Sequence, residues 1–233
     1  MATIGLSDMF YAKITENSEG LETYATPSRL AKAIQADLSI EIAEAILYAD
    51  DAAQESVREF QSGTLTLGVD DIAPEVAADL LGAGIDDNGV LISSSEDVGP
   101  PVAVGFRARR ANGKYKYFWL YRVLFGAPST NLQTKGDSIS FQTPSIEGTI
   151  MRRNKPDSRN RHPWKAEAVE GHPDVANTTI TSWFNAVYDP DFPGVSGASA
   201  PISALAETVA PKTTPKSTAS KPAGQDDAGK SDA

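Results

Sequence analysis

The chain has 233 residues, 40% of them hydrophobic, and a formal net charge of −10 at neutral pH. The apolar fraction supports a real hydrophobic core, whereas the acidic balance disfavours a protein that grips nucleic acid through basic patches. The absence of cysteine excludes a disulfide framework, a thiolate metal site and a cysteine nucleophile.

The N-terminal part of the chain is predicted to form strands. Residues 10–14 and Tyr24 flank a turn at residues 17–20, which predicts a hairpin. Apolar residues alternate imperfectly from 30 to 42 and predict a long strand region.

Residues 41–60 fit two structures. Alanine and glutamate give this segment helical propensity, yet no single helical face collects its apolar residues. The pair Asp50-Asp51 also follows directly on the apolar residues 46–48. Either a helix or a long, polar, outward-projecting hairpin fits the residues.

A cleanly alternating strand and a short helix are predicted next. Leucine and valine at 65, 67 and 69 alternate with small or polar residues, as in a half-buried strand. Pro74 suits the first helical position, Glu75 the first turn and Gly82 the position just past the end.

Residues 102–125 predict a β-hairpin most clearly, because Asn112-Gly113 suits a type I′ turn between two alternating runs. The return strand places Tyr115, Tyr117, Trp119, Tyr121, Val123 and Phe125 on one face, but its other face is also largely apolar. Such a strand must be covered twice, by its own core and by a helix or a second subunit.

The last predicted elements are two strands and a helix. Ile139, Phe141 and Thr143 lead into Pro144, which predicts a bend, a bulge or a strand edge before residues 146–150 continue the pattern. Residues 164–168 alternate again. A helix is predicted from about 178 to 188, because its apolar residues form one stripe that would pack on a sheet: Ile180, Trp183, Phe184, Val187 and Tyr188.

The C-terminus is predicted to be a separate, flexible segment. Residues 192–233 are built mainly from alanine, serine, threonine, proline and lysine, and have no aromatic residue after Phe192. The folded domain is therefore expected to span residues 1–191.

No pattern in the chain predicts catalysis. His162 and His172 each precede a proline in a polar stretch, and the chain has no nucleophile elbow, P-loop or dinucleotide fingerprint. Acidic doublets begin at Asp50, Asp70, Asp86 and Asp226. They could bind Ca²⁺ or serve a glycosidase, but turn chemistry and a helix start explain the middle two. We predict no enzyme, cofactor or metal.

Two further features concern partners and location. Residues 152–161 form a basic cluster without interleaved aromatic residues, interpreted as a solvated loop that pairs with acidic patches of a neighbour. The first residues lack the basic start and apolar run of a signal peptide, and no apolar stretch approaches the roughly 20 residues of a membrane span. We expect a protein made in the cytoplasm, with no membrane partner.

Several stretches, taken in order, resemble major tail proteins of long, non-contractile-tailed bacteriophages, the subunits of the tail tube. They are IGLSDMFYAKIT, LYADD, TLTLGVDDI, VAVGFRARRANGKYKYFWLYR and above all TKGDSISFQTPSIEGTI. The resemblance runs from about Ile4 to Pro190. Residues 152–163 are longer and more basic than the family leads us to expect.

The resemblance implies a mainly β fold, a sandwich of two packed antiparallel sheets with one or two flanking helices. It implies a virion protein, assembled in the host cytoplasm, whose hexameric rings stack into the tail tube. DNA would pass through the lumen without specific binding, and an acidic wall would let it slide. Further partners would be the tape measure, terminator and distal tail proteins.

The resemblance also assigns residues to assembly. Residues 41–60 would contact the next ring as a projecting hairpin, with Tyr48, Asp50, Asp51, Glu55 and Arg58 as the inter-ring residues. The sheet shared between subunits would include Phe106, Tyr117, Trp119, Tyr121 and Phe141.

Three alternatives stay open. A carbohydrate- or protein-binding β-sandwich would use Tyr117, Trp119 and Tyr121 as an exposed platform. A carboxylate-dependent hydrolase would depend on Asp50, Asp51, Asp70 and Asp71. Among phage structural proteins, the third alternative is another tail component, such as a tail terminator or a head–tail connector.

Overall fold

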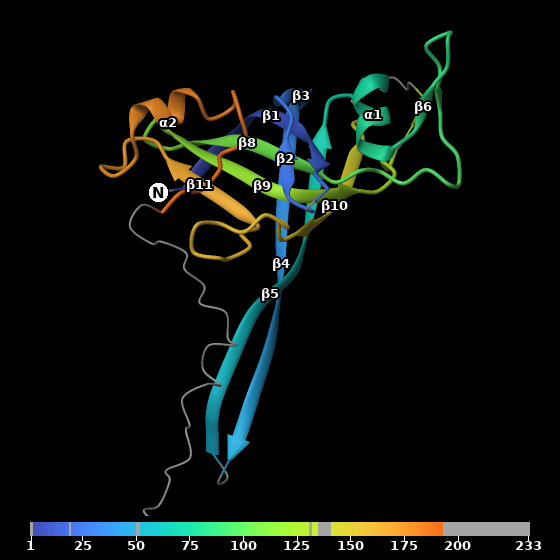
Figure 1. The fold of residues 1–233 in the computed structure, drawn as a ribbon. Helices are drawn as coiled ribbons and strands as arrows, with labels where there is room; N and C mark the ends of the chain where they lie inside the picture. The colour runs from blue at the N-terminus through green and yellow to red at the C-terminus, as the bar shows by residue number, and fades with distance from the viewer. Residues whose placement is uncertain (1, 19, 50–51, 131, 135–140, 193–233) are drawn as a thin grey trace, which may run out of the picture. The chain divides into compact units, whose positions relative to one another are not determined.

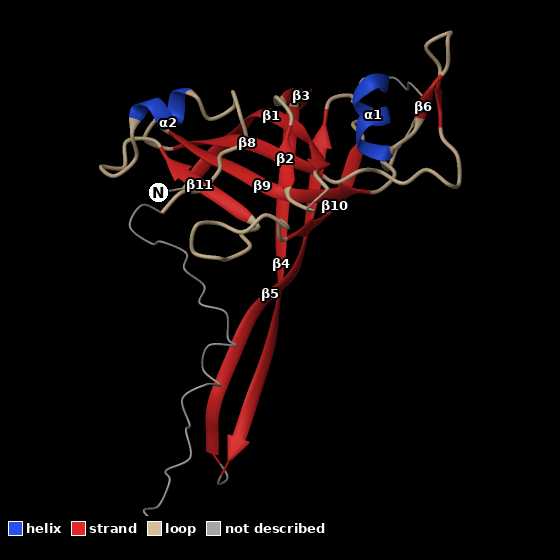
Figure 2. Cartoon of the chain, in the orientation of Figure 1, coloured by secondary structure: helices blue, strands red, loops and turns tan. Residues whose placement is uncertain are grey.

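Antiparallel strands make up most of the computed structural model, which describes residues 2–18, 20–49, 52–130, 132–134 and 141–192 (Figures 1 and 2). The side chains of residues 47–55 and everything beyond residue 192 lie outside the description. The predicted mainly β class with flanking helices is confirmed. The elements are β1 (Thr3–Glu16), β2 (Glu22–Tyr24), β3 (Ser28–Ala31), β4 (Ala33–Ala49), β5 (Ala52–Val69), α1 (Pro74–Leu81), β6 (Gly84–Ile85), β7 (Leu91–Ile92), β8 (Val102–Arg110), β9 (Tyr115–Phe125), β10 (Ser145–Met151), β11 (Lys165–Val169) and α2 (Asn177–Thr181).

Within the described residues, nine strands join in one sheet of order β2-β1-β8-β9-β10-β5-β4, with β3 on β1 and β11 on β9. Strand β9 pairs with β8 along one edge, while β10 and β11 share its other edge. Only Lys32 separates β3 from β4, yet β3 pairs with β1 and β4 with β5. The sheet therefore folds over, and its two layers enclose the main core.

The main core is apolar and draws on both layers. Helix α1 contributes Leu80, and Gly82 ends the helix in the left-handed conformation at φ 73°, as the sequence predicts. The other fully buried members come from six strands: Met9, Leu30, Leu65, Leu67, Val69, Val102, Val104, Leu120, Val123, Ile146 and Ile150.

A β-bulge in β9 changes which face its side chains occupy. Val104 pairs with Leu120 but Val102 pairs with Val123, so β9 has one residue more than β8 between these pairs. Leu120 and Val123 consequently both join the main core, whereas Trp119 points to the other face. The strict alternation that placed Val123 and Phe125 beside Trp119 is wrong beyond Tyr121.

The outer face of β9 is covered by the chain itself. Trp119 is fully buried, and its indole N–H donates to the backbone carbonyl oxygen of Trp183 (3.0 Å). Trp183 and Val187 are buried in the same cluster, with Ile180 and Phe184 packed against it. The second cover that the apolar strand needs is thus the segment around α2, and burying this strand needs no second subunit.

Helix α2 is shorter than predicted and ends at Thr181 rather than near residue 188. Its C-terminal hydroxyls bond to helix carbonyls: Thr181 Oγ1 donates to the Asn177 oxygen, and Ser182 Oγ to that of Thr178. Such local bonds compete with helix continuation. Trp183 N–H then bonds to the Ile180 oxygen in a tighter turn.

The strand predicted before Pro144 is also corrected. Phe141 and Thr143 lie outside any strand, Phe141 is 90% exposed, and Ile139 is outside the described residues. Strand β10 begins only at Ser145, directly after the proline. The predicted N-terminal hairpin forms, with Ile14 opposite Tyr24.

Gly105→Ala should destabilise the fold, because an added Cβ would lie 2.7 Å from the ring of Trp119, which is buried on all sides. We expect the free energy of unfolding to fall by about 2 kcal/mol in urea denaturation. Gly5→Ala is the matched control: its nearest new contact is 3.8 Å away, and it should change stability by less than about 1 kcal/mol. Equal stability of the two variants would contradict tight packing at Trp119.

Candidate functional site

The β4–β5 hairpin leaves the body of the sheet as a two-stranded ribbon, formed by residues 42–49 of β4 and 52–60 of β5 (Figure 1). Residues 63–68 of β5 pair with both β4 and β10, but 52–60 pair with β4 alone. At the point of departure Glu41 pairs with Ser62 and Ile42 with Phe60, which leaves Gln61 as an extra residue in β5. A bulge of this kind bends a strand. Residues 41–60 therefore form the hairpin and not the helix.

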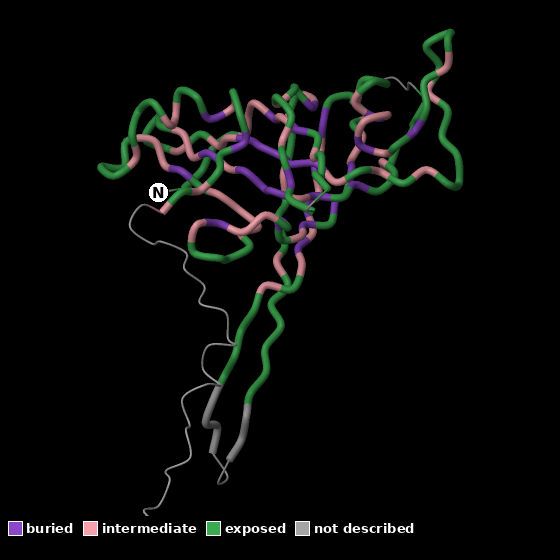
Figure 3. Tube along the Cα trace, in the orientation of Figure 1, coloured by how far each residue is buried: buried purple, intermediate pink, exposed green. Residues whose placement is uncertain are grey.

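The described part of the ribbon is mostly exposed (Figure 3), and three of its exposed residues are apolar. Ile42 is 60% exposed, Val57 53% and Ile46 43%. The ion pairs between its side chains are solvent-exposed, for example Arg58 with Glu44 at 2.8 Å. Exposed ion pairs contribute little stability. Two-stranded ribbons without a hydrophobic cover are marginal in water. The ribbon is thus a surface on which contact with another protein would bury apolar side chains.

Four strands of the large sheet pair with a single neighbour among the described strands, and two of them, β2 and β3, are short strands that both pair with β1. The other two are β4 and β11. Strand β4, 17 residues long, pairs with β5 alone, and β11, 5 residues long, pairs with β9 alone. Open edges present unpaired N–H and C=O groups to any other strand. These edges can therefore form backbone hydrogen bonds with a strand of another chain.

The residues predicted to take part in assembly differ in their burial. Phe106, Tyr117, Trp119 and Tyr121 are buried inside their own chain, whereas Phe141 is exposed. The aromatic platform of the binding-module alternative is therefore absent from the surface. Of the predicted inter-ring residues, Arg58 lies on the ribbon, and the side chains of Tyr48, Asp50, Asp51 and Glu55 lie outside the described part.

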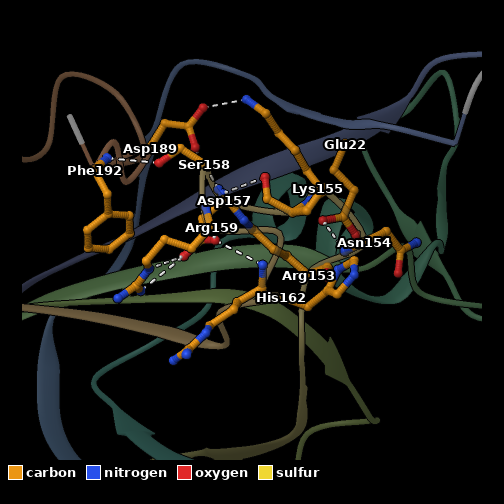
Figure 4. A network of polar contacts seen from close by, with 12 residues as sticks. Glu22, Arg153, Asn154, Lys155, Asp157, Ser158, Arg159, His162, Asp189 and Phe192 are labelled. Carbon is orange, nitrogen blue, oxygen red and sulfur yellow. Dashed lines mark hydrogen bonds and ion pairs between the residues drawn. The ribbon is translucent and has the colours of Figure 1, made fainter. Parts of the chain in front are cut away.

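The basic loop, residues 152–161, is folded around two buried charged side chains (Figure 4), whereas Arg152, Arg159 and Arg161 are exposed. Arg153 is fully buried, and its guanidinium donates to Asp189 Oδ1 (2.8 Å) and stacks 5.0 Å from the Tyr121 ring. Asp157, also buried, accepts hydrogen bonds from the backbone N–H groups of Arg159 and Arg161 at 2.9 Å. Sequence reasoning missed this network, although the Asp157–Arg159 spacing is typical of such a turn.

A second buried carboxylate ties the loop to the N-terminal hairpin. Glu22 is 1% exposed, forms an ion pair with Arg122, and accepts a hydrogen bond from the Asn154 N–H (2.9 Å). A buried charge is tolerated only when it is paired in this way. The loop is therefore held at two points, by Arg153 and by Asn154.

The loop carboxylates are stabilised in their charged form. Burial raises the pKa of Asp189, but hydrogen bonds from Lys155 and Arg153 outweigh that effect and hold the pKa below its usual range. Burial also raises the pKa of Asp157, but hydrogen bonds from Arg161 and Arg159 outweigh it and hold the pKa below its usual range. Both groups act as structural anions rather than as proton donors.

The two acidic doublets that the structure describes accept hydrogen bonds from backbone N–H groups, and only the doublet at 86–87 lies in a turn. Asp70 accepts from the Lys32 N–H (3.0 Å), and Asp86 accepts from Asn88 and Val90 N–H groups. Within the described residues no group of three or more His, Asp or Glu side chains could hold a metal ion. The doublets at 50–51 and 226–227 lie outside the description. None of the described helices has the length and apolar character needed to cross a membrane.

Comparisons with known proteins are sparse. No family model matches the chain, and no curated protein matches it. Among solved structures, it is similar to the tube-terminating cap of the anti-feeding prophage, with 9% identity and a TM-score of 0.35, over 72% of this chain and 93% of that one. It is also similar to the six-fold symmetrised anti-feeding prophage baseplate, with 11% identity and a TM-score of 0.35, over 72% of this chain and 97% of that one. Scores this low assign no function.

Asp189→Asn should destabilise the basic loop, because it leaves the buried Arg153 without its carboxylate. We expect a loss of about 2–3 kcal/mol in the free energy of unfolding at neutral pH. The control is Lys155→Met, which removes the more exposed partner of the same carboxylate and should cost less than about 1 kcal/mol. An Asp189→Asn protein as stable as the control variant would remove Asp189 from this role.

The Asp189→Asn effect should also depend on pH. Because the folded pKa of Asp189 lies below its unfolded value, its contribution is complete above about pH 4 and is lost as pH falls through the folded pKa. The difference in unfolding free energy between the parent chain and Asp189→Asn should therefore shrink as pH drops below about 4. A difference that stays constant down to pH about 2 would contradict the shift.

Proposed function

We propose that the protein is the tail tube subunit of a long, non-contractile-tailed bacteriophage. Its copies form hexameric rings, and the rings stack into the tube through which DNA leaves the capsid. The single observation that carries this proposal is the long unpaired edge of β4, which continues directly into a projecting ribbon with exposed apolar side chains. The ordered sequence resemblance to major tail proteins supports it.

The two edges serve ring formation. A strand edge at β4 and another at β11 allow each copy to be joined on two different sides, so a closed ring covers both of these edges. Exposed Phe141 is the one described aromatic residue of the predicted shared sheet that is free to meet a neighbour. The buried aromatic residues serve instead as the rigid support of that sheet.

The ribbon serves ring stacking. It extends beyond the body, is paired only with itself and exposes Ile42, Ile46 and Val57 to a partner in the next ring. The tube is part of the virion, assembles in the host cytoplasm and meets tape measure, terminator and distal tail proteins at its ends. The acidic charge of the chain, −10, leaves DNA free to slide.

Electron microscopy of the purified chain tests the proposal. Negative staining should show rings or tubes at high protein concentration. A chain that stays monomeric at every concentration and salt would overturn it, and a single ring that never stacks would favour a terminator or connector.

Shortening the ribbon should abolish stacking without unfolding the body. We would replace residues 44–58 by Asn-Gly, which closes a two-residue turn after the Ala43–Glu59 pair. The shortened chain should keep its unfolding transition but form no tubes in the same micrographs. Tubes of normal length from this chain would remove the ribbon from the stacking contact.

A smaller change tests residues 50 and 51, which connect β4 to β5 in the sequence. Asp50→Lys together with Asp51→Lys should shorten tubes, since the resemblance assigns both residues to the inter-ring contact. Asp50→Asn with Asp51→Asn, which removes the charge without reversing it, should have a weaker effect. Equal tube lengths for the parent chain and both variants would exclude an electrostatic stacking contact at Asp50 and Asp51.

A further inference from the structure

A basic hollow lies where the ribbon meets the body. It has a volume of about 730 Å³ and is lined by seven residues: Arg58, Glu59, Phe60, Arg152, Arg161, His162 and Trp164. Phe60 and Trp164 stack at 4.8 Å between ring centroids and 5° between ring planes, which provides an apolar floor. The hollow thus combines this aromatic floor with three arginines and a single carboxylate, that of Glu59.

Two arginines of the hollow form no ion pair among the described residues. Arg58 is paired with Glu44, but neither Arg152 nor Arg161 has a carboxylate within ion-pair distance among the described residues. Both belong to the basic loop, which the buried Arg153 and Asp157 hold in place. Positioned cations of this kind favour a partner with carboxylates, and the aromatic floor favours one that is also apolar.

The same chain carries a segment of this chemistry. The finger, residues 84–98, holds β6 and β7, which pair only with each other among the described strands. It contains Asp86, Asp87, Glu96 and Asp97 and no lysine or arginine. It also exposes four apolar side chains: Ile85 (40%), Val90 (55%), Ile92 (53%) and Val98 (79%).

The finger cannot occupy the hollow of its own chain. It lies on the α1 side of the sheet, whereas the basic loop lies on the α2 side (Figure 1). Its turn is ordered, because Asp86 Oδ1 accepts hydrogen bonds from the N–H groups of Asn88 (3.0 Å) and Val90 (2.8 Å). An ordered acidic and apolar projection on one side thus matches a cationic, aromatic hollow on the other.

We propose that the finger of one copy docks into the basic hollow of a second copy. Val90 and Ile92 meet the Phe60–Trp164 floor, and Asp87 and Glu96 pair with Arg152 and Arg161. The contact joins two different surfaces, so it propagates from copy to copy around a ring or along a filament. It rests on the proposed function only in that it requires self-association.

Charge exchange tests the contact. Arg152→Glu with Arg161→Glu, and separately Asp87→Lys with Glu96→Lys, should each raise the protein concentration needed for assembly by roughly tenfold or more in sedimentation. A chain carrying all four changes restores the opposite charges and should return to within about threefold of the parent. Arg109→Glu with Arg110→Glu is the control of equal charge change and should assemble as the parent does.

Cross-linking gives a second measurement that does not depend on tube formation. Because the chain has no cysteine, Asn88→Cys and Arg152→Cys proteins each carry a single thiol. A short bis-maleimide linker should join them when the two proteins are mixed, but neither protein to itself. A mixture of Asn88→Cys and Arg110→Cys should stay unlinked.

The outcomes separate the two proposals. Tubes that form equally well with every charge variant, or mixtures that do not cross-link, would overturn the docking contact and leave the tube assignment standing. Cross-linked mixtures from a chain that makes no rings would support the contact and overturn the tube assignment. A parent chain that never self-associates would overturn both.

Discussion

The burial of β9 on both faces is the constraint on which the rest of the structure depends. Because of the bulge after Tyr121, Val123 points into the main core together with Leu120. Trp119 points to the opposite face, into the second core that it forms with Trp183. That indole is fully buried and donates to the Trp183 carbonyl oxygen. Truncating a buried tryptophan typically costs about 3–5 kcal/mol, a large share of the stability of a domain. The chain therefore completes both cores alone, and association is left to parts outside them: the β4 edge, the ribbon, the basic hollow and the finger.

Sequence patterns predicted the elements whose causes are local. Pro74 and Gly82 bound a helix through their own backbone preferences. The hairpin predicted at Asn112-Gly113 forms with Gly113 in the left-handed conformation at φ 80°, but Asn112 lacks the positive φ of the predicted type I′ turn, and the turn is closed by Gly113 N–H donating to the Arg110 oxygen. The bulge in β9 escaped prediction because it is defined by the register with β8. The burial of Arg153 escaped because its carboxylate partner is 36 residues away. Residues 41–60 show the same limit, since their helical propensity yields to strand pairing across the hairpin.

The charges of the basic loop divide into two kinds once the fold is known. Arg153, Lys155 and Arg159 form ion pairs with Asp189 and Asp157, so they hold the loop and their charges are compensated within the chain. Arg152 and Arg161 remain without a carboxylate among the described residues. A composition count therefore overstates the basic surface of this loop. Charge pairs at an interface set orientation more than affinity, so affinity for any partner must come from apolar area such as the Phe60–Trp164 floor.

The long edge of β4 raises the question of why two copies should not simply pair through it. Strand β4 carries Asp37, Glu41 and Glu44 and no lysine or arginine. Pairing β4 with β4 of a second copy would place these carboxylates near one another, and like charges across a strand pair are destabilising. The edge is thus biased against a symmetric contact and toward a different surface of the neighbour. The finger and the basic hollow are likewise two unlike surfaces, on opposite sides of the sheet. Both features favour the same outcome, because contacts between unlike surfaces build rings and filaments rather than closed dimers.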